Sequence, residues 1–354
     1  MKLDRSVNTA RKLQGWRCET PAKINLFLEV LGKRPDGYHD LDTVMLAIDL
    51  TDTLEIYPAQ EGRLTLDLDL SEAQQVQNLA LAQIDTTWKI PTQGVGTDSN
   101  LVLRALDALR SRLDSLQPAA LNSQRTGAHV ILKKRIPSQA GLGGGSSNAA
   151  AALVLGSLLW QVPYDPSLLG SIASELGSDI NFFLEGNNGT NWTARCTQRG
   201  QIVQPIANQC EIHGLIVHPP AGCSTAQVFS LVRESIAQRE QAVDPGELVE
   251  CLSQSPKAFD QPARLGQLLY NRLDAAAAAC TKWVEQSARR IDRFDPLGQC
   301  LSGSGSARFC LLADRSQAQV LATELGLEGN FRAYPFSGWT SPSIGQQITA
   351  IRRF

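Results

Sequence analysis

The sequence predicts an α+β fold, and three segments support this prediction. Apolar and polar side chains alternate over residues 21–30, which is typical of a half-buried strand. Apolar side chains recur at helical spacing over residues 101–116, which indicates an amphipathic helix. A strand at 129–132 leads through a glycine-rich loop into an Ala/Leu helix. With 354 residues, 43% of them hydrophobic, the chain can form one large or two ordinary domains.

The glycine-rich loop, residues 137–148, is the strongest motif in the chain. Glycines allow positive φ and let backbone N–H groups approach a phosphate, and the helix start adds further N–H groups and a positive dipole. The loop has no Gly-Lys-Ser/Thr, and Ser146 interrupts the Gly-x-Gly-x-x-Gly register, so neither standard nucleotide motif is present. A flexible surface loop is the alternative to the predicted phosphate site.

Lys23 and Asn25 share one face of the first predicted strand, because side chains two residues apart point the same way. From spacing alone, two solvated polar residues on an edge are favoured. The same pair could also polarise a transferring phosphoryl group and bind a hydroxyl group.

Three further positions have both a structural and a functional interpretation. Tyr38 and His39 follow a Pro-Asp-Gly turn. They either belong to a plain hairpin connection or bind a nucleobase. Asn100 begins the helix at 101–116, which either packs on a sheet without a ligand role or lies along a nucleotide. Asp179 is a cap or turn residue on sequence grounds alone.

The order of these motifs resembles the GHMP small-molecule kinases. The string Gly-Leu-Gly-Gly-Gly-Ser-Ser-Asn-Ala-Ala resembles their ATP loop, and Leu-Gly-Ser-Asp-Ile-x-Phe-Phe at 176–183 resembles the segment with their catalytic aspartate. Gly37-Tyr38-His39 resembles the cytidine-recognising segment of the diphosphocytidyl kinases within that superfamily. A second Gly/Ser turn at 302–306 resembles the motif that supports the ATP loop from the second domain.

The resemblance implies a role for each matching residue. Lys23 and Asp179 would be catalytic, and Asn25, Tyr38, His39, Thr225 and Phe229 would bind the substrate. One departure is found at 198–201, where Gln198 and Gln201 replace an expected glycine and glutamate. The residues implied in ATP binding are Asn100, Pro137, Ser138, Gln139, Ala140, Gly141, Leu142, Gly143, Gly144, Gly145, Ser146 and Ser147.

The resemblance also implies a two-domain GHMP kinase fold, with an N-terminal ribosomal-protein-S5-like domain and a C-terminal ferredoxin-like α/β domain. We expect a flexible extension at 1–17, an ATP-binding domain at 18–200 with an insertion at 71–97, and a second domain at 201–354. The basic extension could be a transit peptide. The implied cofactors are ATP and Mg²⁺, with metal ligands that the sequence does not identify.

The implied reaction is phosphorylation of the 2-hydroxyl group of a cytidine-diphosphate-linked methylerythritol, in the non-mevalonate isoprenoid pathway. Two alternatives stay open: a mevalonate- or homoserine-type kinase, and a non-catalytic ligand-binding protein on the same fold. A net charge of -2 and a pI near 6.1 give no reason to expect nucleic acid or a membrane as partner. Eight cysteines without the spacing of a metal site predict reduced thiols, and therefore a cytoplasmic protein. We expect a monomer or a homodimer.

Overall fold

The structure is a computed structural model that describes most of the chain. The predicted insertion at 71–97 lies outside the described residues except for Ser71, and so do the first 13 residues of the predicted extension. The described residues are 14–71, 100–116, 127–185, 191–237, 242–254, 261–327, 331–340, 344 and 348–352.

The larger sheet is built on two long antiparallel strands, β1 (Gln14–Lys33) and β2 (His39–Ala59). Its strand order is β12-β1-β2-β4-β3, while β5 and β6 extend it from β2 and β8 pairs in parallel with β1. A 3₁₀ turn, η1 (Gln60–Gly62), follows β2. The other strands are β3 (Leu64–Asp69), β4 (Gly127–Lys133), β5 (Thr193–Gln198), β6 (Ile202–Pro205), β8 (Tyr270–Asn271) and β12 (Thr349–Arg352).

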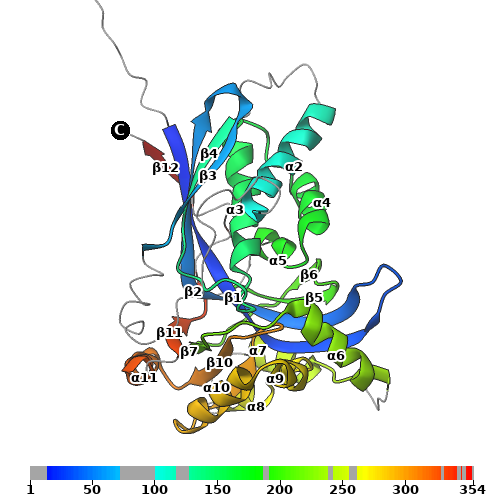
Figure 1. Cartoon of the computed structure of the whole chain (residues 1–354), viewed down its shortest axis with the longest axis vertical. Helices are drawn as coiled ribbons and strands as arrows, with labels where there is room; N and C mark the ends of the chain where they lie inside the picture. The colour runs from blue at the N-terminus through cyan, green and yellow to red at the C-terminus, as the bar shows by residue number, and fades with distance from the viewer. Residues whose placement is uncertain are drawn as a thin grey trace, which may run out of the picture.

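Four helices cover one face of the upper part of this sheet (Figure 1). Residues 149–155 of α3 are all buried, because α3 lies between the sheet and its neighbouring helices; a helix that is apolar all round needs such a position. The predicted amphipathic helix is confirmed as α2. The four helices are α2 (Leu101–Leu116), α3 (Gly144–Leu159), α4 (Pro166–Leu176) and α5 (Ile180–Glu185).

A second, four-stranded antiparallel sheet lies in the lower part of the molecule (Figure 1). Its order is β11-β7-β10-β9, from β7 (His213–His218), β9 (Gly298–Leu301), β10 (Arg308–Leu312) and β11 (Arg332–Ser337). Its helices are α6 (Thr225–Ala237), α7 (Gly246–Ser253), α8 (Gln261–Gln267), α9 (Asp274–Cys280), α10 (Lys282–Asp292) and α11 (Arg315–Leu327). The predicted α+β class is confirmed.

The C-terminal half of the chain also contributes to the larger sheet. The predicted boundary at residue 200 falls in the turn between β5 and β6, which pair with each other. Strand β12 pairs with residues 14–17, which the sequence analysis assigned to the extension and which form the start of β1. Strands from beyond residue 200 therefore belong to the larger sheet, namely β6, β8 and β12. The proposed residue ranges of the domains stay a prediction.

Strand β1 departs from the regular alternation that its sequence predicts. Bulges or register shifts interrupt its pairing with β2, one of them between Asn25 and Phe27. A bulge changes which side chains share a face. Phe27 is 2% exposed and packs against Tyr270, with 5.3 Å between ring centroids, and the polar side chains of Lys23, Asn25 and Glu29 are buried as well. Both faces of β1 are covered, so this strand is not half-buried.

None of the eight cysteines forms a disulfide, and seven of them are buried. Burial raises the pKa of Cys18 and of Cys300 to about 12, so these thiols stay protonated and unreactive. Within the part of the chain that the structure describes, no helix combines the length and apolarity needed to cross a membrane.

Candidate active site

The fold brings Lys23 of β1 and Asp179, which directly precedes α5, into contact. The Lys23 Nζ atom lies 3.5 Å from Asp179 Oδ2. The lysine side chain is 4% exposed, whereas the aspartate side chain is 29% exposed. A buried cation therefore lies behind a carboxylate that solvent, or a substrate hydroxyl group, can reach.

A short chain of hydrogen bonds fixes Lys23. Its Nζ donates to Asn25 Oδ1 (2.6 Å), Asn25 Nδ2 donates to Thr43 Oγ1 (2.8 Å), and Thr43 Oγ1 donates to the carbonyl of Phe27 (2.6 Å). Asn25 is 1% exposed, and its side-chain amide is hydrogen-bonded to Lys23 and to Thr43. The predicted contact between Asn25 and the substrate stays a prediction. Thr43 was not predicted as part of the site, because its role depends on the pairing of β1 with β2.

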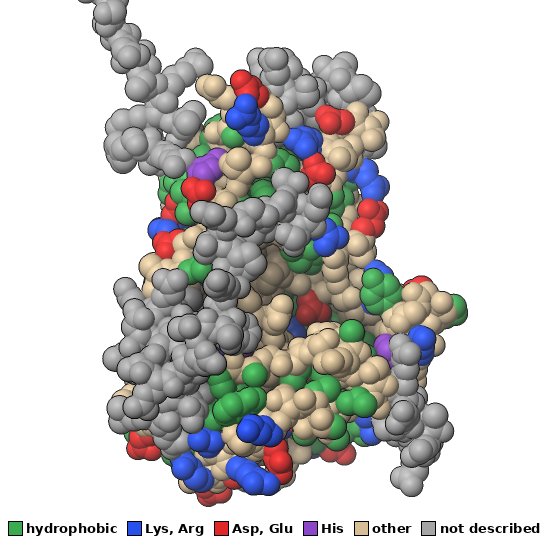
Figure 2. All heavy atoms as spheres, in the orientation of Figure 1, with side chains coloured by type: hydrophobic (Ala, Val, Ile, Leu, Met, Phe, Trp, Pro, Cys, Tyr) green, Lys and Arg blue, Asp and Glu red, His purple; other side chains and the backbone are tan. Residues whose placement is uncertain are grey.

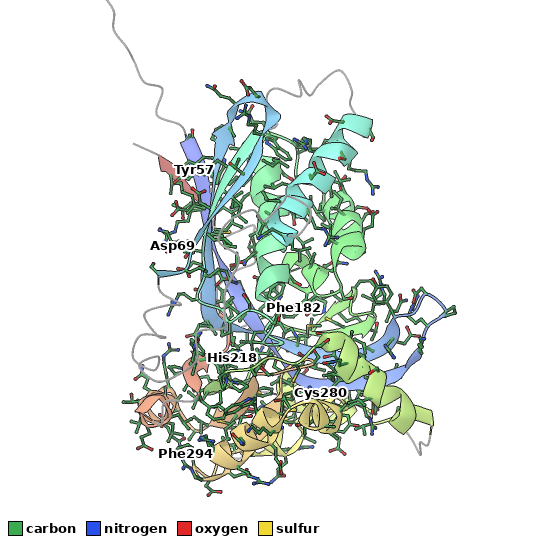
Figure 3. All side chains as sticks on the ribbon, viewed as in Figure 1. Tyr57, Asp69, Phe182, His218, Cys280 and Phe294 are labelled. Atoms are coloured by element: carbon green, nitrogen blue, oxygen red, sulfur yellow. The ribbon has the colours of Figure 1, made fainter. Side chains whose placement is uncertain are left out.

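An aromatic cluster holds the segment that carries Asp179. Phe182 and Phe183 of α5 pack edge to face with ring centroids 5.1 Å apart, and Trp192 Nε1 donates to the carbonyl of Phe182 (3.0 Å). Phe182 lies near the middle of the molecule, where α5 meets the sheet (Figure 3). Because these rings are buried, they fix the position of α5 and therefore that of Asp179, which directly precedes it.

The glycine-rich loop lies directly against this pair. Gly143 has φ of 68° and precedes α3, and a Cβ atom there would come within 2.8 Å of Lys23 Cγ and 3.2 Å of Phe183 Cε2. Lys23 N also donates to the carbonyl of Leu142 (2.9 Å). Gly145 is exposed, with no atom within 4 Å of a hypothetical Cβ. The first N–H groups of α3 therefore open beside the lysine.

A buried carboxylate fixes both ends of this loop. Asp52, fully buried on β2, accepts hydrogen bonds from the backbone N of Ile136 (2.9 Å) before the loop and from Asn148 Nδ2 (3.0 Å) after it. It also forms an ion pair with Lys134. The loop is thus fastened to the central strands at each end, and a flexible surface loop is excluded.

The second Gly/Ser turn supports the loop from the other sheet. Ser302 Oγ donates to the carbonyl of Gly141 (2.9 Å), and Ala307 N donates to the carbonyl of Ala140 (3.1 Å). Gly141 has φ of 77°, and a Cβ atom there would lie 1.9 Å from the Ser302 carbonyl oxygen. Only glycine satisfies both the dihedral angle and this contact. These contacts agree with the supporting role predicted for the turn.

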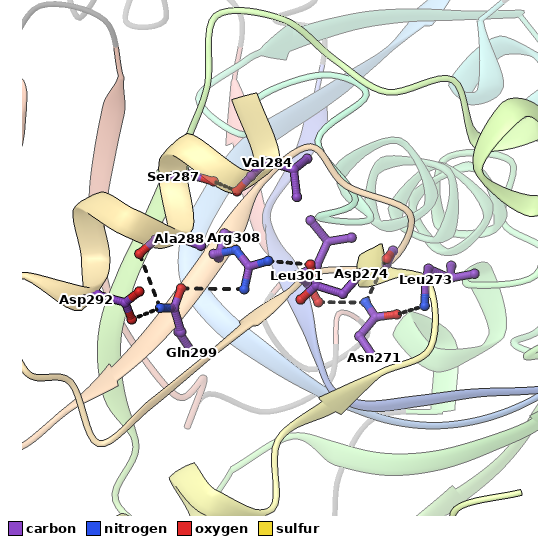
Figure 4. A network of polar contacts seen from close by, with 11 residues as sticks. Asn271, Leu273, Asp274, Val284, Ser287, Ala288, Asp292, Gln299, Leu301 and Arg308 are labelled. Atoms are coloured by element: carbon purple, nitrogen blue, oxygen red, sulfur yellow. Dashed lines mark hydrogen bonds and ion pairs between the residues drawn. The ribbon is translucent and has the colours of Figure 1, made fainter. Parts of the chain in front are cut away.

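Asn271 in turn holds this Gly/Ser turn (Figure 4). Its Nδ2 donates to the carbonyls of Leu301 (2.8 Å) and Gly303 (2.8 Å), while its Oδ1 accepts from the backbone N of Leu273 (2.9 Å). In the same network Arg308 forms an ion pair with Asp274 at the start of α9. Asn271 was not predicted as a site residue, because no local sequence pattern links it to residues 301–303.

Two buried hydroxyl groups at these loops have no hydrogen-bond partner among the described residues. They are Ser147 Oγ in the first turn of α3 and Ser306 Oγ in the Gly/Ser turn. A buried hydroxyl without a partner costs free energy, so its position suits a group that binds there. Hydroxyl oxygen is also an acceptable ligand for Mg²⁺, which keeps most of its contacts with water and phosphates. Among the described residues no cluster of three acidic, His or Cys side chains offers a dedicated metal cage.

The predicted substrate residues lie on two segments that meet. The ring of His39 stacks on Phe229 of α6, with centroids 4.9 Å apart and an interplanar angle of 28°. Thr225 Oγ1 lies 2.9 Å from Ser304 Oγ, so α6 contacts the Gly/Ser turn. Tyr38 is 55% exposed, and the guanidinium carbon of Arg199 lies 4.7 Å from its ring centroid.

Asn100 acts as a helix cap in the structure. Its Oδ1 accepts a hydrogen bond from Val102 N (2.9 Å), and its carbonyl accepts from Arg104 N (3.0 Å). This is the ordinary role of asparagine at a helix start. Its role in ATP binding stays a prediction.

The surface is hollowed between the upper and lower parts of the molecule, and an acidic side chain lies at the floor of the hollow (Figure 2). The carboxylate-lysine pair, the N-terminal end of α3 and the hollow together suit transfer of a phosphoryl group.

Comparison with known proteins agrees with this chemistry. Residues 100–187 match the family model of the GHMP kinases N terminal domain. A 4-diphosphocytidyl-2-C-methyl-D-erythritol kinase of Pelotomaculum thermopropionicum is 34% identical over 302 residues, covering 85% of this chain and 90% of the relative. The kinase of the same name from Synechococcus sp. is 35% identical over 312 residues, covering 86% and 90%.

The chain belongs to the 4-diphosphocytidyl-2-C-methyl-D-erythritol kinase family. It is therefore an ATP-dependent small-molecule kinase. A solved 4-(cytidine 5'-diphospho)-2C-methyl-D-erythritol kinase matches with a TM-score of 0.65 at 26% identity, covering 91% of this chain and 99% of that one. A solved mevalonate kinase shares the fold, with a TM-score of 0.57 at 18% identity over 92% of this chain and 99% of its own.

Proposed function

We propose that this kinase transfers the γ-phosphoryl group of ATP to the 2-hydroxyl group of 4-diphosphocytidyl-2-C-methyl-D-erythritol, a step in isoprenoid precursor synthesis. The observation that carries the proposal is the 3.5 Å contact between Lys23 and Asp179, directly beside Gly143. The names of the relatives support the choice of substrate.

Asp179 accepts the proton of the substrate hydroxyl group in this proposal. A positioned general base contributes roughly 10²- to 10⁴-fold in rate. Lys23 lies next to the same carboxylate and stabilises the negative charge that develops on the phosphoryl oxygens. Because Asn25 and the carbonyl of Leu142 already fix Lys23, little reorganisation is needed when the substrates bind.

The glycine loop and α3 hold the ATP phosphates. The N–H group of the exposed Gly145 and the hydroxyl group of Ser147 would bind phosphate oxygens or the accompanying metal ion. When bound, Mg²⁺ neutralises the charge of the phosphates. Tyr38, His39 and Phe229 bind the cytosine ring, and Thr225 adds a polar contact on α6.

The protein acts in the cytoplasm under this proposal. Its eight free cysteines support this assignment, because reducing compartments keep thiols unpaired.

ADP release with purified protein, ATP and Mg²⁺ tests the proposed reaction. We expect release that depends on the cytidylyl substrate, and no comparable release with mevalonate or homoserine. ADP release with mevalonate or homoserine, and none with the cytidylyl compound, would show that the substrate assignment is wrong.

A further inference from the structure

The turn between β5 and β6, residues 198–201, joins the two ends of the proposed substrate site. Figure 1 shows β5 and β6 between α5 and the β1–β2 hairpin. Gln198 has φ of 61°, the left-handed region, where the family pattern has a glycine. Gln201 holds this geometry, because its Oε1 accepts from Arg199 N (2.9 Å) and its Nε2 donates to Gln198 Oε1 (3.0 Å).

Arg199 lies between the groups proposed to bind the nucleobase and the reacting alcohol. Its guanidinium carbon is 4.7 Å from the ring centroid of Tyr38. The next residue, Gly200, borders the proposed base: a Cβ atom there would lie 3.8 Å from Asp179 Oδ1. A substrate whose base lies at Tyr38 and whose hydroxyl group lies at Asp179 must extend past this turn.

Arg199 is not paired directly with a carboxylate of the described residues, although its charge helps Arg34 to lower the pKa of Asp36. Lys23 pairs with Asp179, Arg34 pairs with Asp40, and Arg195 pairs with Asp42. Arg199 forms no ion pair with any residue that the structure describes; its Nη2 donates to the carbonyl of Ser174 (2.7 Å). That single bond fixes the side chain and leaves other guanidinium N–H groups for a ligand.

We propose that Arg199 binds the diphosphate group that links the cytidine and the polyol of the substrate. This inference rests on the proposed function. A guanidinium group presents several N–H donors in one plane and suits phosphate oxygens better than a single ammonium group does. Arg199 is then a specificity-determining residue: it distinguishes a nucleoside diphosphate substrate from the small alcohols that have no such group.

Steady-state kinetics of Arg199→Gln test the proposal. We expect KM for the cytidylyl substrate to rise about 10- to 100-fold, as for the loss of hydrogen bonds to a charged group. KM for ATP and kcat at saturating substrate should stay within about threefold, because Arg199 does not contact the glycine loop. Arg199→Lys, which keeps the charge without the planar donors, should restore part of the affinity.

Arg112→Gln is the matched control. Arg112 binds Glu175, next to Ser174, so the same charge is removed from the same end of α4. Its KM values should equal those of the wild type. An equal rise in KM in both variants would attribute the effect to net charge and overturn the proposal.

Competitive inhibition by CDP and by cytidine separates a phosphate contact from a contact with the base. The wild type should prefer CDP, and Arg199→Gln should lose about 10- to 100-fold of that preference while binding cytidine as before. Equal weakening of CDP and cytidine would assign Arg199 to the base and overturn the phosphate contact. If the wild type phosphorylates the cytidylyl substrate and Arg199→Gln has unchanged KM and CDP inhibition, only this inference is overturned. If the wild type does not phosphorylate the cytidylyl substrate, the proposed function is overturned.

Discussion

The two ends of the proposed site differ in how firmly the protein fixes them. At the phosphoryl-transfer end, Lys23 is 3% exposed and is held by Asn25, and the glycine loop is fastened by Asp52 and by the Gly/Ser turn. At the nucleobase end, Tyr38 is 55% exposed on a hairpin and contacts a single guanidinium group. The groups proposed to act in phosphoryl transfer are thus held by several partners, whereas Tyr38, proposed to bind the base, lies on the surface beside the buried His39.

This difference predicts two kinds of mutant. Changes at the buried end should lower kcat or stability, because each side chain there has several partners that a substitution disturbs. Changes at the exposed end should raise KM for one substrate and leave the rest of the protein unaffected.

A large effect on the chemical step is expected for Lys23→Met. Removing the ammonium group while keeping most of the side-chain volume should lower kcat about 10²- to 10³-fold, as for the loss of one donor to developing charge. Lys133→Met is the control. Lys133, at the end of β4, has a side chain that is 40% exposed, and its Nζ atom lies 3.6 Å from the Glu55 carboxylate of β2. Single-turnover rates measure both variants, and a normal rate in Lys23→Met would remove Lys23 from the chemistry.

Asn271→Asp tests whether the second sheet positions the glycine loop. The new oxygen would face the carbonyls of Leu301 and Gly303, so we expect a loss of about 2 to 4 kcal/mol in the free energy of unfolding. KM for ATP should rise about tenfold, because the Gly/Ser turn no longer holds Gly141 in place.

Asn208→Asp is the matched control for this variant. Asn208 is fully buried and donates to Thr193 Oγ1 (2.9 Å), away from the Gly/Ser turn. It should lower stability without raising KM for ATP. A KM that changes equally in both variants, measured well below the unfolding temperature, would mean that Asn271 has only a general structural role.

Tyr38→Ala should act only on the substrate side. Loss of a stacking ring is expected to raise KM for the cytidylyl substrate about tenfold, with KM for ATP unchanged. Tyr164 is equally exposed, at 54%, and lies outside the site, so Tyr164→Ala should leave both values unchanged. An unchanged KM in Tyr38→Ala would break the assignment of the hairpin to the nucleobase.

The smallest effect on activity is expected for a group outside the site. Burial, with a further contribution from Arg332, lowers the pKa of His218 from 6.5 to about 4. The unfolded chain therefore binds the proton more readily, and stability is lost as the pH falls from about 6.5 to 4, by at most about 3 kcal/mol. His218→Gln should flatten the pH dependence of urea unfolding in this range and leave activity at pH 7 unchanged. The same acid sensitivity in both proteins would contradict this cause.

Much of the site could be predicted from the sequence because its motifs are local. The glycine loop and the Tyr38 turn are each contained in a few residues whose backbone chemistry is readable, and the resemblance of 176–183 identified Asp179. The resemblance to the GHMP kinases also implied that Lys23 and Asp179 are both catalytic, and the structure places them in contact.

What could not be predicted depends on contacts between distant segments. The bulge after Asn25 and the hydrogen bond that Asn25 donates to Thr43 arise from pairing between β1 and β2. Asn271 reaches residues 301 and 303 only because β8 lies beside the turn after β9. The return of β12 to β1 likewise has no signal in either segment alone, which is why residues 14–17 were assigned to the extension.

The most direct test of the central claim is the rate of Asp179→Asn. This variant keeps the shape of the side chain and removes its ability to accept a proton. We expect kcat to fall about 10²- to 10⁴-fold while binding of ATP and of CDP, measured by calorimetry, is retained. A kcat near that of the wild type, with both ligands bound normally, would contradict the claim that Asp179 is the base.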